Sequence, residues 1–277
     1  MKPWMRISLW VIFGVGCFTL LSLAYNAQGE KVVKAPEISI HVNGEHALLT
    51  EDELLARLKR HGYLFNGQSQ EELKLHQIET FIKRMSEVRQ VDVFAQVGDR
   101  WSIDIETRQP IARIYNKYGE SFYLDSDGEV MSASAQHCAR VLVITGEISD
   151  RKNSVSVTEI INNNSLKTIR KLDNLYRISN YVCNDPFLQS LIGQIHVQKS
   201  GDLVLIPLVG EQVIVFGTAS TDKEVKEKFD KLKVFYKEGI PYEGWDTYEL
   251  INLKFTHQVV CRNTKKDGKS TDNRTIQ

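Results

Sequence analysis

A long apolar segment near the N-terminus precedes a chain in which short apolar patterns alternate with polar turns. Residues Ile7–Tyr25 are almost entirely apolar, and no charged residue lies between Arg6 and Glu30. Nineteen helical residues rise about 28 Å, close to the hydrocarbon thickness of about 30 Å in a bilayer. The pattern predicts one transmembrane helix over 7–25, a cytoplasmic stub at 1–6 and a polar linker at 26–36.

The flanking charges predict which side of the membrane the chain faces. The short N-terminal side carries the free amine, Lys2 and Arg6, and positive residues accumulate on the cytoplasmic side. Residues 26–277 are therefore expected outside the cytoplasm. A cleaved signal peptide is the alternative, because Ser22-Leu23-Ala24 offers a small-residue cleavage site. The apolar run exceeds the usual h-region of about 7–15 residues, which favours a retained anchor.

Residues 37–108 have the pattern of a β-α-α-β-β module. The predicted elements are strand 38–42, a helix from the capping box 50–53, a helix from the capping box 69–72, and strands 88–97 and 101–107. In the last strand Trp101, Ile103 and Ile105 alternate with polar residues. Two amphipathic helices on one side of a three-stranded sheet would bury both apolar faces.

Residues 109–261 are mainly β, which gives an α+β fold class for the whole chain. The predicted elements are strands 111–116, 121–124, 130–131, 141–144, 192–197, 203–207, 212–216 and 248–260, and helices 165–182 and 221–238. The second of these helices begins with a third capping box, Thr221–Glu224, is amphipathic and precedes the last strand. Residues 262–277 are expected to form a disordered tail, because they are polar with one apolar residue near the end.

Composition argues against several function classes. The chain has 35 basic and 35 acidic residues, and because Lys2 and Arg6 precede the span, the part beyond it has a net charge of −2. This balance gives no electrostatic basis for binding nucleic acid. Beyond the span lie Cys138, Cys183 and Cys261, of which one pair could form a disulfide.

No pattern indicates catalysis, a metal, a cofactor or a small-molecule substrate. The seven histidines have no metal-binding spacing, and no nucleophile elbow or phosphate loop is present. Asp125, Asp127 and Gly128 resemble the start of a calcium loop, but no acidic residue occupies its closing position, so a β-turn is expected there. The chain is therefore expected not to be an enzyme.

The order of these segments resembles the FtsQ/DivIB family of bacterial cell-division proteins. The stretches that carry the likeness are Val42-Asn43-Gly44, Thr107–Ala112, Phe122–Val130, Phe216-Gly217, Lys228–Leu232, Ile251–Phe255 and Gln258–Val260. No single motif is specific, but their order and spacing together are. The likeness spans residues 1–261. The sequence departs from the family pattern in its short cytoplasmic stub and in the irregular stretch 132–190.

The resemblance implies that 37–108 is a POTRA domain and 109–261 a β domain. It further implies a scaffold at the division septum, anchored once in the inner membrane as a type II protein, with most of the chain periplasmic. The expected partners are two small, single-span coiled-coil proteins, FtsB- and FtsL-like, and through them the septal peptidoglycan synthase. The alternatives are a POTRA-containing envelope assembly protein, or an exported enzyme or receptor with a cleaved signal peptide.

In that family the final strand pairs with a partner strand, and an edge strand has the unpaired backbone groups that this β-augmentation requires. The predicted partner-binding residues are Leu253, Lys254, Phe255, Thr256, His257, Gln258, Val259 and Val260. Phe255 is the expected anchor, and an ordinary core strand is the alternative. Weaker candidates are Lys226, Lys233 and Lys237 on the preceding helix, and the strands 38–42 and 88–97.

Overall fold

The structure is a computed structural model that forms two compact units. It describes residues 4, 10–20, 22, 32–42, 44, 48–96, 100–133, 138–153, 156–163, 165–166, 170–264 and 273–276, the last four by backbone alone. The first unit comprises Met1–Asn43 and Leu49–Thr107, and the second comprises Gly44–Leu48 and Arg108–Gln277.

The predicted span Ile7–Tyr25 lies partly outside the described residues, as do most of the stub and the first part of the linker. Residues 10–20 are helical, and their large apolar side chains, such as Trp10 and Phe18, are exposed to solvent. Within the described ranges no helix has both the length and the apolar character needed to cross a membrane.

The first unit is a three-stranded sheet with two helices. Its elements are β1 (Glu37–His41), α2 (Glu51–Arg60), α3 (Leu75–Lys83), β2 (Val88–Ala95) and β3 (Trp101–Thr107). This is the β-α-α-β-β order that the sequence predicts. The strand order is β1-β3-β2, with β1 parallel and β2 antiparallel to β3. Leu58 and Ile82 from the helices share one core with Trp101 and Ile103 from β3.

Only one of the two predicted capping boxes in this unit starts a helix. The Thr50 hydroxyl accepts the Glu53 N–H at 3.3 Å, and α2 begins there. In the second box Ser69 N–H donates to the Glu72 carboxylate at 2.9 Å, yet α3 begins only at Leu75. The buried Gln68 side chain donates to the carbonyls of Tyr63 and Glu72, which holds this segment as a turn.

The second unit is one large mixed sheet with helices. Its strands are β4 (Pro110–Tyr115), β5 (Ser121–Asp125), β6 (Val130–Ser132), β7 (Leu142–Gly146), β8 (Ile192–Val197), β9 (Leu203–Pro207), β10 (Val213–Gly217), β11 (Tyr248–Asn252), β12 (Val259–Asn263) and β13 (Asn273–Ile276). Its helices are α4 (Val157–Asn162), α6 (Leu172–Cys183), α7 (Pro186–Leu191), α8 (Asp222–Val234), the π-helix η1 (Phe235–Gly239) and α9 (Ile240–Glu243). The strand order is β13-β12-β11-β10-β9-β8-β7-β4-β5-β6.

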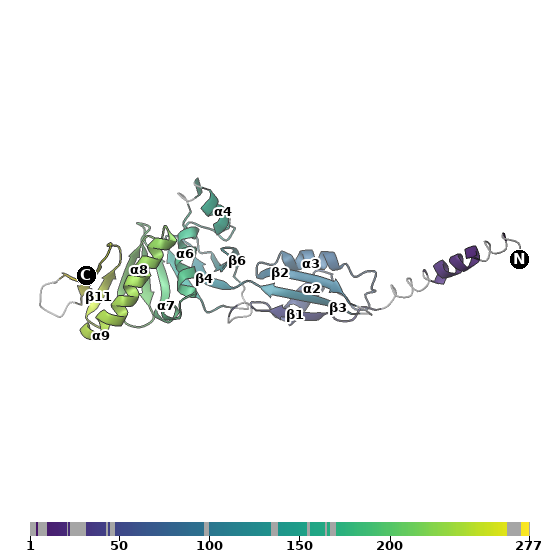
Figure 1. Cartoon of the computed structure of the whole chain (residues 1–277), viewed down its shortest axis with the longest axis horizontal. Coiled ribbons are helices and arrows are strands. Elements are labelled where there is room, and N and C mark those ends of the chain that lie inside the picture. Colours follow the sequence, from purple (N-terminus) through teal and green to yellow (C-terminus); the bar gives the residue numbers. More distant parts are fainter. Residues whose placement is uncertain are drawn as a thin grey trace. The chain divides into compact units, whose positions relative to one another are not determined.

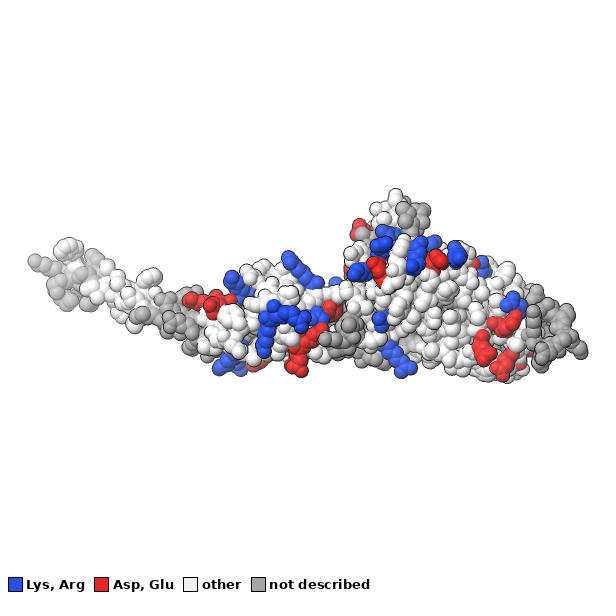
Figure 2. All heavy atoms as spheres, turned by 180° about the vertical axis from the view of Figure 1, so that it is seen from behind, with Lys and Arg blue, Asp and Glu red and all other residues white. Residues whose placement is uncertain are grey.

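Helices α6, α7 and α8 lie over one face of this sheet (Figure 1). Phe229 of α8 is fully buried, stacks on Tyr181 of α6 at 5.1 Å between ring centroids, and contacts Phe216 of β10 at 4.9 Å. The view from behind shows a second unit whose middle carries few charged side chains (Figure 2). The contacts of Phe229 hold α8 against α6 and against strand β10.

Candidate partner-binding site at the end of the sheet

The predicted single strand 248–260 is a hairpin. Strands β11 and β12 are antiparallel, with Ile251 opposite Cys261 and Asn252 opposite Val260. The Asn252 side chain accepts the Lys254 N–H at 3.0 Å, and His257 has a φ of 63°, so the chain reverses without glycine or proline. The prediction of one long strand was wrong because this turn uses asparagine and histidine.

Neither strand of the hairpin lies at the sheet edge. β11 lies between β10 and β12, and β12 lies between β11 and β13. The outermost strand at this end is β13. The segment 262–277, which was expected to be a disordered tail, therefore contains β13 and also the last two residues of β12, Arg262 and Asn263. Four residue pairs join β12 and β13, from Val259 opposite Ile276 to Arg262 opposite Asn273. The edge expected at the predicted final strand is thus formed by β13 instead.

The predicted site residues divide into buried and exposed ones. Leu253 is fully buried and Val259 nearly so, which makes both part of the core. The intermediate Gln258 and Val260 flank the start of β12. The exposed residues form the turn of the hairpin, which we call the hairpin loop; they are Lys254, Phe255, Thr256 and His257. The Phe255 side chain is 45% exposed, so it is available to a partner.

Backbone and lysine contacts hold the hairpin loop against the sheet and α8. Leu253 N–H donates to the Val215 carbonyl at 2.9 Å. Lys231 of α8 donates to the carbonyls of Leu253 at 3.2 Å and Phe255 at 2.6 Å. Burial lowers the pKa of Lys231, and nearby Lys228 lowers it further. Lys254 pairs with Asp202 at 2.8 Å.

Gly217 explains one of the family-like motifs. It has a φ of 79°, and a Cβ atom there would lie 2.8 Å from Cγ of Lys254. Glycine at this position lets the aliphatic part of Lys254 cross β10 and reach Asp202. The motif is therefore a packing feature beside the hairpin loop.

The first turns of α8 form a compact polar cluster. The Thr221 hydroxyl accepts the Glu224 N–H at 3.2 Å, which confirms the predicted capping. Glu224 pairs with Lys228 at 2.6 Å, and the buried Lys228 also donates to the Thr218 carbonyl at 2.7 Å. Burial alone would raise the pKa of Glu224, but hydrogen bonds from Lys228, Thr218 and the Ser220 N–H outweigh it and lower that pKa.

This cluster predicts an acid-sensitive contribution to stability. A carboxylate whose pKa is lower in the folded state stabilises that state above its unfolded pKa, and the contribution is lost as pH falls through the folded pKa. The ordinary value for Glu224 is 4.5, so the loss begins as pH falls below it. Between about pH 6 and pH 3 the wild type is expected to lose more stability than Glu224→Gln in urea titrations. Parallel losses in the two proteins would contradict this role.

The weaker candidate residues have intramolecular partners or lie elsewhere. Lys226 pairs with Asp230 at 2.5 Å and Lys233 with Asp185 at 2.6 Å, while Lys237 is exposed. In the first unit, β1 and β2 are the two edges of their sheet, so both keep an outer side. Two of these three lysines, both on α8, thus form ion pairs with acidic residues of the chain itself.

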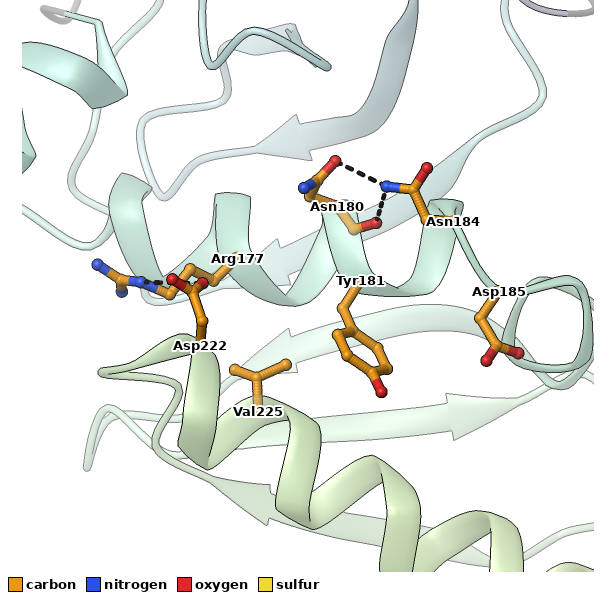
Figure 3. A pocket seen from close by; sticks show the side chains of 7 residues that line it. All are labelled: Arg177, Asn180, Tyr181, Asn184, Asp185, Asp222 and Val225. Atoms are coloured by element: carbon orange, nitrogen blue, oxygen red, sulfur yellow. Dashed lines mark hydrogen bonds and ion pairs between the residues drawn. The ribbon is translucent and has the colours of Figure 1, made fainter.

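A polar groove of about 280 Å³ lies between α6 and the start of α8 (Figure 3). Tyr181 points between the two helices, and Arg177 faces Asp222 at 3.7 Å (Figure 3). The Arg177 guanidinium also donates to Asp173 and the Ala219 carbonyl. These charges pair with one another, so the groove joins the two helices rather than presenting a reactive group.

The acidic, histidine and cysteine side chains do not gather into a metal site in the described part of the chain. Across the described ranges, no group of three or more His, Cys, Asp and Glu side chains could hold a metal ion. The Asp125 carboxylate accepts N–H groups of Asp127 and Glu129 and an Arg108 hydrogen bond at 2.8 Å, as a turn requires. All four cysteines, each in the described part of the chain, are free thiols. Burial raises the pKa of Cys261 to about 12, so this thiol stays protonated.

The comparison with known families bears on the second unit. A model of the family "FtsQ/DivIB, C-terminal related" matches residues 109–262, which is more than half of the chain and runs from β4 into β12. The chain belongs to the FtsQ/DivIB C-terminal related family. No curated protein matches it. Membership in the FtsQ/DivIB family indicates a role in cell division, among non-enzymatic scaffolds that act with other division proteins.

Proposed function

We propose that this chain is a membrane-anchored division scaffold that binds FtsB- and FtsL-like coiled-coil proteins and links them to septal peptidoglycan synthesis. Its partners dock at the C-terminal end of the ten-stranded sheet, where a partner strand joins the sheet by backbone hydrogen bonds. The observation that carries the proposal is the family match, which covers the sheet from β4 onward and ends in β12. Next to β12 lies the hairpin loop, with an exposed aromatic side chain at Phe255.

The chemistry of this surface suits strand addition. An open sheet ends in a row of backbone N–H and C=O groups, and a partner strand satisfies that row with hydrogen bonds. Phe255 offers a large apolar surface beside the row, as interface anchors do. The loop that carries Phe255 is held by Lys231, so its shape is largely set before binding.

The N-terminal parts of the chain anchor the protein in the membrane and connect the anchor to the second unit in this proposal. Residues 7–25 are the retained inner-membrane anchor of a type II protein, and 37–108 is a POTRA domain on the periplasmic side. Confinement to one membrane raises the effective concentration of single-span partners. Mass measurement of the mature N-terminus tests the anchor, because a cleaved signal peptide would remove Ile7–Tyr25.

Hydrogen exchange tests the docking site. The full chain in a lipid nanodisc is mixed with the purified coiled-coil pair from the same cell, and amide exchange is compared with and without the pair. We expect slower exchange in peptides covering 248–263 and unchanged exchange in β1 and β2. Protection confined to β1 or β2 would move the site to the first unit, and the lack of any complex would refute the proposed function.

A further inference from the structure

The outer side of β12 is occupied by the chain's own C-terminal strand. β13 pairs antiparallel with β12 over Val259–Arg262, and nine residues, 264–272, connect the two strands. The family match ends at Arg262, so the connecting residues and β13 lie beyond the matched domain. The strand that completes the sheet is therefore additional to the domain that defines the family.

β13 pairs with the outer backbone groups of β12. Val259 and Cys261 are buried, and buried backbone N–H and C=O groups are almost always hydrogen-bonded. The inner side of β12 pairs with β11, so β13 pairs with the outer groups. Any extended segment that replaced β13 could make the same backbone hydrogen bonds.

β13 is poorly suited to hold this position against a competitor. It has four residues, Asn-Arg-Thr-Ile, of which only Ile276 is apolar. The register puts Arg274 opposite the buried Cys261, where an apolar residue would match its neighbours better. Four residue pairs with β12 are the only strand pairing of β13 within the described residues.

The segment that connects β12 and β13 is polar in sequence. Residues 264–272 read Thr-Lys-Lys-Asp-Gly-Lys-Ser-Thr-Asp and include no apolar side chain. At its start, Thr264 is fixed by hydrogen bonds to the carbonyls of Thr247 at 2.9 Å and Asp246 at 2.7 Å. These contacts fix the C-terminal end of β12 independently of β13.

We propose that β13 is a strand that closes the β12 edge in cis and that a partner strand displaces it. This inference rests on the proposed function and names how its site is regulated. The displacing segment is extended, spans at least four residues, and carries apolar residues at the two positions opposite Val259 and Cys261. The free protein is thereby protected from edge-to-edge association, and a partner gains access only by out-competing β13.

Proline substitutions in β13 test the exchange in the full chain. N–H groups of an antiparallel strand alternate between partner and solvent, so Arg274→Pro or Thr275→Pro removes a donor to β12. Ser270→Pro in the connecting segment is the matched control, and a chain ending at Thr264 removes β13 altogether. Amide exchange of β12 in the free protein and the Kd for the coiled-coil pair are measured for each chain.

The inference predicts opposite effects on the two readouts. In the more disruptive proline variant and in the shortened chain, β12 amides are expected to exchange at least about ten-fold faster. The Kd for the pair is expected to fall about five-fold or more, because the partner strand no longer has to compete with β13 for β12. Ser270→Pro is expected to behave as the wild type in both measurements.

A disulfide between β12 and β13 provides the reverse test. Val260 and Thr275 are paired in the register, so Val260→Cys with Thr275→Cys joins the two strands under oxidising conditions. Capture of the pair is expected to fall at least about ten-fold when oxidised and to recover on reduction, because the closed state is then locked. Each single cysteine variant controls for the substitution itself.

The outcomes separate this inference from the proposed function. If the wild type binds the pair but β12 exchange is unchanged by shortening, β13 does not occupy the edge and the inference is overturned. Faster β12 exchange with unchanged or weaker binding also overturns it, since β13 would not be a competitor. If no chain binds the pair, the proposed function itself fails, and the exchange model falls with it.

Discussion

Replacing Phe255 by lysine is expected to weaken capture of the coiled-coil pair by about 100-fold or more, as loss of a central aromatic anchor does. Phe255 is the one large apolar side chain among the exposed residues of the hairpin loop, 254–257. A lysine there would add positive charge beside Lys231 and Lys254 and remove the apolar contact. Phe255→Ala is expected to have the same direction of effect. Binding is measured with the full chain by pull-down and by titration.

Phe187 provides a matched control for this substitution. It is 43% exposed, lies on α7, and packs against Tyr236 rather than the hairpin. Phe187→Lys therefore makes the same chemical change at a similar exposure, and it is expected to leave capture near the wild-type level. Folding of both variants is checked by amide exchange of α8. Wild-type capture by Phe255→Lys, with α8 intact, would remove Phe255 from the site.

Truncating Phe229 to alanine is expected to destabilise the second unit by about 3–5 kcal/mol, the usual cost of removing a buried phenylalanine. Its ring is fully buried, stacks on Tyr181 and contacts Phe216, so it joins α8 to both α6 and β10. α8 also carries Lys231, which holds the hairpin loop. The substitution should therefore weaken partner binding as a consequence of lost folding.

The stability of each unit can be followed separately in a urea titration, by amide exchange of peptides from α8 and from α3. The α8 transition is expected to shift to lower urea while the α3 transition is unchanged. Val234→Ala, at the exposed end of the same helix, is expected to change stability by less than about 0.5 kcal/mol. A Phe229→Ala chain with an unshifted α8 transition would show that the aromatic contacts of Phe229 do not stabilise the packing of α8.

Much of the sheet could be predicted because its strands have clear alternation and clear ends. β8 and β9 have the predicted bounds, since the polar turn Lys199–Asp202 separates two runs rich in apolar residues. α8 begins after the Thr221 capping box, as predicted. Two missed helices also had signals: Ser156 and Glu159 form a capping box before α4, and Asp185-Pro186 starts α7.

The candidate site was harder to predict, for two physical reasons. Ile251, Leu253, Val259 and Cys261 are all buried odd-numbered positions, so one alternation runs through both strands and hides the turn between them. β13 pairs with β12 through the backbone, and its polar composition carries no apolar pattern to read. The sequence thus indicated the region of the site but not its hairpin or its occupied edge.

A photo-reactive amino acid placed at residue 255 in living cells tests partner binding most directly. We expect cross-links to a small single-span division protein when residue 255 carries the probe. We expect none to that protein when the probe replaces Phe187. Cross-links to the same protein from residue 187 but not from 255, or from neither position, would contradict partner binding at the C-terminal end of the sheet.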